Sequence, residues 1–157
     1  MDTLTAGGRS YVVARATEED VPAIVALLTD DDIGACRETD TLDPYLKAFQ
    51  EIDADPRQFL VVVRDAADRV VGTMQLTLLP GLARAGATRL QVEAVRLAAA
   101  VRGSGVGTAL FAWAHEYGRR RGATVAQLTT DKRRADAQRF YRRIGYQASH
   151  EGLKLAL

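Results

Sequence analysis

Apolar positions along the chain recur with strand and helix spacing, a pattern that predicts a sheet with helices packed on it. The strand pattern marks five runs, at residues 11–15, 59–63, 70–79, 89–98 and 123–129. Helical spacing of apolar residues marks four segments, which begin near residues 17, 43, 106 and 137. The last segment, 146–157, is expected to supply one or two closing strands.

The order of these elements is strand, two helices, three strands, helix, strand, helix, strand, which is typical of a mixed α/β fold with helices on the faces of a sheet. The short connection 65–68 favours an antiparallel hairpin. The length of 157 residues fits one domain, which we expect over 11–157. Residues 1–10, polar and Gly-rich, are expected to form a flexible tail.

Composition excludes several classes of protein. Apolar residues make up 47% and charged residues 26%, as in an average globular protein. The single cysteine, Cys36, excludes an internal disulfide framework and a zinc site built on thiolates, and His115 and His150 are lone histidines, so no metal site is expected. His115 is expected on a helix surface. No apolar run reaches a membrane span of about 18 residues, and the N-terminus lacks the pattern of a signal peptide, which predicts a cytoplasmic protein with no membrane partner.

The formal net charge of +1 hides a strong asymmetry between the two halves of the chain. Residues 1–80 hold 7 Lys and Arg against 15 Asp and Glu, a net −8, and residues 81–157 carry +9. This asymmetry indicates that the second half meets an anion, and the alternative is a set of solvated helix faces. Nucleic acid is not the expected anion, because no aromatic residues are interleaved with the basic ones.

A glycine-rich turn lies between the strand 89–98 and the helix that follows it. In Arg102-Gly-Ser-Gly-Val-Gly107, three glycines in five residues allow positive φ and a close approach of a ligand to the backbone. The N–H groups at the start of the helix favour a phosphate there, whereas the alternative is an ordinary turn. The turn lacks the Lys of a nucleotide P-loop, and its glycine spacing does not match the dinucleotide fingerprint.

The residues of this turn resemble the GCN5-related N-acetyltransferase (GNAT) superfamily, whose acetyl-coenzyme A motif is (Q/R)-x-x-G-x-(G/A). Arg102, Gly105 and Gly107 occupy the defining positions. Downstream, Ala137-x-x-x-Tyr141-x-x-x-Gly145-Tyr146 is similar to the family's A-x-x-x-Y-x-x-x-G-F, and the segment 13–20 resembles its first strand and helix. The resemblance covers about residues 11–157. It implies the GNAT fold, a mixed and mostly antiparallel sheet of six to seven strands flanked by about four helices.

The resemblance also implies acetyl-CoA as cosubstrate, with no metal. The pantetheine arm would pair with the backbone of the strand before the turn, the pyrophosphate would lie on the turn, and backbone N–H groups near Leu97 would polarise the thioester carbonyl. The implied cofactor-binding residues are Val95, Arg96, Leu97, Arg102, Gly103, Ser104, Gly105, Val106, Gly107, Thr108, Arg134 and Tyr141. The family often has Asn at the position of Arg134, where its side-chain amide contacts the cofactor. In this sequence that amide contact is in doubt, and the charge of Arg134 could reach a phosphate instead. The run 132–134 could do the same or form a solvated helix start.

Two residues are candidates for catalysis. Glu93 is one of only two acidic residues between positions 81 and 130, and it stands where several family members carry a catalytic Glu. We expect burial to raise its pKa and make it the base, acting directly or through water, while the alternative is an ion pair with Arg89 or Arg96. Tyr141, by resemblance, is the acid that protonates the coenzyme A thiolate; the alternative is packing in the core.

The sequence therefore predicts an acetyl-CoA-dependent N-acetyltransferase, with direct attack by a primary amine of a small molecule. The acceptor is expected against the helices of the first half and the loops around residues 30–56 and 80–88, and the net −8 of this region suits a cationic acceptor. Two alternatives stay open: a protein or peptide N-acetyltransferase, and a non-catalytic acyl-CoA sensor. The superfamily often dimerises, so a homodimer is compatible with the sequence.

Overall fold

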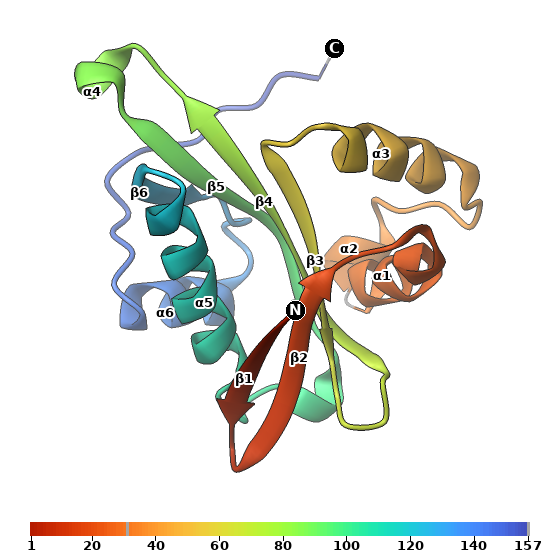
Figure 1. Ribbon diagram of the computed structural model, residues 1–157. Helices are drawn as coiled ribbons and strands as arrows, with labels where there is room; N and C mark the ends of the chain where they lie inside the picture. The colour runs from red at the N-terminus through yellow and green to blue at the C-terminus, as the bar shows by residue number, and fades with distance from the viewer. Residues whose placement is uncertain (31, 157) are drawn as a thin grey trace.

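Runs rich in Val, Thr and Leu form the strands of one sheet in the computed structural model, which describes residues 1–30 and 32–156 (Figure 1). The strands of the described part are β1 (Asp2–Ala6), β2 (Arg9–Arg15), β3 (Gln58–Arg64), β4 (Val70–Pro80), β5 (Thr88–Leu97) and β6 (Ala123–Leu128). They lie side by side in the order of the sequence. Every neighbouring pair is antiparallel except β5 and β6, which are parallel.

Helices cover both faces of this sheet, with α1 and α3 on one face and α5 and α6 on the other (Figure 1). The bounds are α1 (Val21–Thr29), α2 (Asp32–Ala35), α3 (Asp43–Ala54), α4 (Ala83–Gly86), α5 (Val106–Arg120) and α6 (Ala135–Arg143). The predicted mixed, mostly antiparallel sheet with about four helices is confirmed, since α2 and α4 are single turns. None of the helices in the described ranges is long and apolar enough to span a bilayer.

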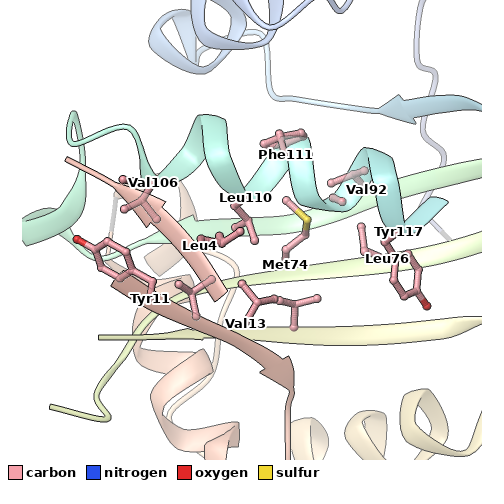
Figure 2. Packing of buried hydrophobic residues seen from close by; sticks show 14 of the residues in the cluster. Leu4, Tyr11, Val13, Met74, Leu76, Val92, Val106, Leu110, Phe111 and Tyr117 are labelled. Atoms are coloured by element: carbon pink, nitrogen blue, oxygen red, sulfur yellow. The ribbon is translucent and has the colours of Figure 1, made fainter. Parts of the chain in front are cut away.

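The main hydrophobic core lies between the sheet and α5 (Figure 2). Leu110 and Phe111 of α5 are at most 1% exposed, and they pack over the apolar side of the central strands, represented by Met74, Leu76 and Val92. Every second residue of β5 enters this core, so the residues between them face the opposite side of the sheet. A smaller cluster on that opposite side joins α1 and α3 to β3.

The N-terminal residues expected to form a flexible tail instead form β1, so the predicted boundary at residue 10 is wrong. Gly7 and Gly8 both have positive φ, 55° and 73°, and allow the tight turn that pairs β1 with β2. Leu4 is buried, and Asp2 accepts a hydrogen bond from the Trp113 indole, 2.8 Å between Nε1 and Oδ2. Composition marked these residues as polar, but their alternation and their glycine pair predict a hairpin.

The closing strands expected in 146–157 are also absent from the described residues. Gly145, with φ of 101°, ends α6, and residues 146–156 continue without regular structure; Leu157 lies outside the described residues. Leu153 and Leu155 are 93% and 85% exposed. Their alternation matches a strand, but a strand is stable only beside a partner edge, which periodicity does not supply.

Candidate active site

A β-bulge interrupts β5 next to the centre of the sheet. Gln75 of β4 pairs with Glu93, and Thr73 pairs with Arg96, so two residues of β5 stand opposite one residue of β4. Ala94, inside the bulge, has φ of 50°, a left-handed conformation that is costly for a residue with a side chain. The bulge turns the backbone of residues 94–96 out of the regular ladder.

Beside this bulge, β5 and β6 separate. Their parallel pairing runs from Thr88 to Val92 on β5 and ends there. The edge of residues 93–97 that faces β6 therefore has no strand partner. The Val95 carbonyl accepts a hydrogen bond from the Arg96 guanidinium, and the Leu97 carbonyl accepts one from Arg102. A sheet that splits in this way provides hydrogen-bonding groups at the bottom of a cleft.

An open cleft of about 1840 Å³ lies between β5, β6, α6 and the segment after α6. Five residues predicted from the sequence line it: Glu93, Val95, Arg96, Arg134 and Tyr141. The structure therefore brings both predicted catalytic residues to one cavity. It does not bring Leu97 or residues 102–108 into the lining of that cavity.

Glu93 is exposed in the cleft, so the expectation that this carboxylate is buried is wrong. It lies on the face of β5 opposite to the buried Leu90 and Val92. In the described part of the chain, it forms no ion pair with Arg89 or Arg96, which was the structural alternative. The Glu93 carboxylate is therefore accessible to a ligand in the cleft.

Tyr141 combines a packed ring with a place in the cleft wall. Its ring lies edge-on to Phe111, Phe140 and Tyr146, with centroids 5.5 to 6.0 Å apart. Burial raises the pKa of Tyr141, and the nearby positive charges of Arg96 and Arg134 oppose that rise. The phenol is therefore protonated at neutral pH and sits where cations stabilise negative charge. The packing interpretation and the acid interpretation of this residue are compatible.

The glycine turn shapes the start of α5. Gly105, the residue before the helix, has φ of 89°, and Gly103 has φ of 76°, conformations that favour glycine. At Gly107 a Cβ would lie 3.3 Å from Phe140 of α6 and 3.4 Å from Leu97 of β5. The absence of a side chain there lets α5, β5 and α6 meet. The turn thus lies behind the cleft wall, with the first N–H groups of a 15-residue helix at its end.

Two side chains of the turn are engaged within the protein. The Arg102 guanidinium pairs with Asp30, and its Nε donates to the Leu97 carbonyl at 2.9 Å. Ser104 Oγ donates to the Val101 carbonyl at 2.7 Å. The contact with Leu97 ties the turn to β5, and the predicted phosphate contact, the Arg102 guanidinium, is already matched by a carboxylate.

The basic run before α6 divides between two roles. Arg133 pairs with Asp131 at 3.0 Å and Arg37 approaches the same carboxylate at 2.6 Å, which ties segments 94 residues apart. Hydrogen bonds from Arg133 hold the pKa of Asp131 far below its usual range, so it stays ionised. Arg133 is thus a structural residue. Arg134, at the N-terminus of α6, lines the cleft beside Tyr141.

The acceptor side of the cleft differs from the expectation of an acidic wall. Of the described residues before Pro80, only Leu28, Arg37 and Glu38 line it. Other carboxylates of the first half are held by arginines, as in the pairs Asp20–Arg64 and Asp53–Arg15. The net charge of residues 1–80 therefore does not predict the charge of the few side chains that this half contributes to the cleft. The loop 80–88 lines the cleft as expected, through Gly81, Ala83, Arg84 and Ala87.

Sequence reasoning missed a hydrogen-bonded pair in the cleft wall. His115, expected on the helix surface, is half-buried, and its Nε2 lies 2.9 Å from the Tyr146 hydroxyl. Burial lowers the pKa of His115 and raises that of Tyr146 to about 12. Both residues are therefore neutral at pH 7. The helical position of His115, four residues after the buried Phe111, was the available signal.

Comparison with protein families gives one match that spans most of the chain. Residues 21–146 match the model of the Acetyltransferase (GNAT) family. Among curated proteins, an aminoalkylphosphonate N-acetyltransferase of Salmonella typhimurium is 48% identical over 50 residues, and the match spans 32% of each chain. The chain thus aligns with about a third of the length of that relative.

Solved structures share the fold over nearly the whole chain. A protein of Bacillus halodurans C-125 named a transcriptional regulator is 41% identical, with a TM-score of 0.88 over 94% of this chain and 99% of that one. A putative acetyltransferase of Agrobacterium tumefaciens is 21% identical, with a TM-score of 0.80 over 93% of this chain and 99% of that one. The fold of this chain is thus seen in experimental structures.

Proposed function

Because the chain belongs to the GNAT family of acetyltransferases, we propose that it transfers the acetyl group of acetyl-CoA to a primary amine of a small molecule. The amine attacks directly while both substrates are bound. The observation that carries this proposal is the convergence of Glu93 and Tyr141 on one cleft, beside the open edge of β5.

The open edge of β5 supports binding of the pantetheine arm of acetyl-CoA alongside Val95 and Leu97, where it would replace the hydrogen bonds that their carbonyls accept from Arg96 and Arg102. N–H groups of the bulge would stabilise the oxyanion of the tetrahedral intermediate, a contribution of about 3 kcal/mol for one such donor. The N–H groups at the start of α5 suit the pyrophosphate. Arg134 adds a positive charge on the same side of the cleft.

Glu93 and Tyr141 have complementary tasks in the transfer. An alkylammonium has a pKa of about 10.4, so Glu93 accepts its proton, directly or through one water, before the nitrogen attacks. The nitrogen forms a bond to the carbonyl carbon, and the carbon–sulfur bond then breaks. Tyr141 donates its proton to the departing sulfur, and the thiol product has a pKa of about 8.5, close enough to that of a phenol for transfer. The nitrogen loses its second proton as the amide forms, and that proton returns to the Tyr141 phenolate through water.

The small-molecule acceptor is supported by the name of the partial relative, an aminoalkylphosphonate N-acetyltransferase. It is also supported by the cleft wall around Arg37, Glu38 and Arg84, where charged side chains of both signs suit a polar metabolite. Assays with peptide N-termini and with lysine peptides distinguish a protein acceptor.

The experiment measures thiol release from acetyl-CoA with a panel of primary amines. We expect turnover with at least one amine, and we expect Glu93→Gln to lower kcat by 10- to 100-fold at pH 7. The loss shrinks toward pH 9.5, because more of the amine is then deprotonated without a base. Glu116→Gln, which removes a carboxylate paired with Arg120 on α5, is the matched control and changes kcat less than twofold.

A second candidate function is a non-catalytic acyl-CoA sensor, favoured by the name of the 41% identical Bacillus halodurans protein. Tight binding of acetyl-CoA without turnover of any amine would replace the proposed transferase by this function. Failure of acetyl-CoA to raise the melting temperature would contradict both.

A further inference from the structure

The face of β5 that lies away from the core carries a row of polar side chains at the cleft. Leu90 and Val92 are buried under α5, so Arg89, Gln91 and Glu93 share the other face. All three line the cleft. The row therefore presents a cation, an amide and a carboxylate in a line along one strand.

The amide at the middle of this row is fixed by its neighbour on β6. Gln127 Nε2 donates to Gln91 Oε1 at 2.7 Å, and the two residues are direct partners in the parallel ladder. A similar bond joins Gln75 to Gln58 at 2.8 Å on the same face of β4 and β3. The floor of the cleft between its two charged ends is thus neutral and ordered.

Arg89 is the cationic end of the row, and it is half-buried. Its neighbours in the sheet are Leu79 on β4 and Val125 on β6, neither of which is charged. Within the described ranges, no carboxylate pairs with Arg89, whereas Arg15 and Arg64 on other strands each hold an aspartate. A guanidinium partly removed from water and not matched by an acid favours an anion from outside the protein.

The other cations of the cleft are less suited to this task. Arg37 is matched by Asp131, and Arg96 and Arg134 lie near Tyr141, where coenzyme A is expected. The remaining cations that line the cleft are exposed: Arg84, Arg119, Lys132, Arg142 and Lys154. Glu93, the opposite end of the row, lies next to the bulge where the thioester is expected. Glu93 is four positions after Arg89 on an extended strand, which puts their Cα atoms about 13 Å apart, and two long side chains shorten the gap that a ligand must span.

We propose that the acceptor is a primary amine that also carries an anionic group, such as a phosphonate, phosphate or carboxylate. Arg89 binds the anion, Gln91 contacts the middle of the molecule, and the amine is presented to Glu93. This inference rests on the proposed transferase function and assigns to Arg89 the selection of the substrate.

The test compares 2-aminoethylphosphonate with n-propylamine, which are similar in length but differ in the anionic group. We expect the KM of the wild-type protein for the phosphonate to be at least tenfold lower than for propylamine. Arg89→Gln raises the KM for the phosphonate at least tenfold, leaves kcat within threefold and leaves the KM for propylamine unchanged. Arg89→Lys restores part of the affinity, because it restores the charge without the planar fork. Arg9→Gln, on the exposed start of β2, changes neither KM.

Calorimetric titration of the same two amines into the coenzyme A-saturated protein separates this inference from the proposed function. Binding of the phosphonate that requires Arg89, without turnover, supports the anion site and contradicts the transferase. Turnover of both amines with equal KM, or an equal rise of both KM values in Arg89→Gln, contradicts the anion site and leaves the transferase standing. Absence of both binding and turnover overturns both.

Discussion

At the scale of single residues, Tyr141 shows how one side chain serves packing and chemistry. Its ring is held by three aromatic neighbours, which fixes the direction of the hydroxyl without a hydrogen bond of its own in the described residues. Burial keeps the hydroxyl protonated, while Arg96 and Arg134 favour negative charge nearby. The same two cations would therefore stabilise a thiolate that forms beside the phenol.

Tyr141→Phe keeps the ring packing and removes the proton donor. We expect kcat to fall about 10²-fold, the range for loss of a general acid, with the melting temperature within 2 °C of the wild type, about the shift for less than 1 kcal/mol in a chain of this size. Initial rates of thiol release at saturating substrates measure the effect. Tyr117→Phe, a tyrosine of α5 that packs against Phe59 outside the cleft, is the control. An equal loss in both variants, or none in either, would contradict the acid role.

His115 makes the stability of the fold depend on pH. Burial and the charge of Arg119 lower its pKa in the folded state, whereas the unfolded value is about 6.5. The unfolded chain therefore binds more protons below that pH, so stability is lost as the pH falls below about 6.5 and is unaffected above it. We expect His115→Gln to reduce the loss of unfolding free energy between pH 7.5 and 5.5 in urea titrations. His150→Gln, on the exposed C-terminal segment, leaves that loss unchanged.

At the scale of elements, the meeting of α5, β5 and α6 depends on one missing side chain. A Cβ at Gly107 lies at a distance that few real contacts show, and the opposing atoms belong to Phe140 and Leu97. Since α6 carries Tyr141 and β5 carries the bulge, separation of these elements at Gly107 changes the geometry of the cleft.

Gly107→Val tests this junction. We expect the added isopropyl group to push α6 away and to weaken acetyl-CoA binding at least tenfold in calorimetric titrations, even though valine has a higher helix propensity than glycine. Ala112→Val, on the exposed side of the same helix, introduces the same side chain away from this junction and serves as control. If Gly107→Val binds acetyl-CoA with unchanged affinity, the packing of α6 against Gly107 does not determine the geometry of the cleft.

At the scale of the whole molecule, the N-terminal strand belongs to the core. Leu4 is 8% exposed between β2 and α5, so Leu4→Ala leaves a cavity and should lower the free energy of unfolding by about 2–3 kcal/mol. Leu82→Ala, at a position 99% exposed, should change it by less than about 0.5 kcal/mol. Urea unfolding followed by circular dichroism measures both. A change below 0.5 kcal/mol for Leu4→Ala would mean that β1 does not contribute to stability.

Much of this molecule could be predicted from sequence because its signals are local. Hydrophobic periodicity marked the central strands and α5, and the turn 102–107 marked the start of that helix. What could not be predicted depends on partners distant in sequence: the packing of β1 against α5, the missing partner edge for 146–156, and the ion pairs that hold carboxylates of the acidic half. The bulge at Ala94 and the pairing of His115 with Tyr146 are likewise contacts that no periodic pattern encodes.

The strand order of the sheet has a consequence for how the chain assembles. Because the strands lie in the order of the sequence, each one emerging from the ribosome can join an edge that already exists, without threading past an earlier strand. Glu93 is in place once β5 has joined β4. The other side of the cleft arrives with β6 and α6, which are made after β5, so a nascent chain holds a nearly finished sheet before the cleft is complete.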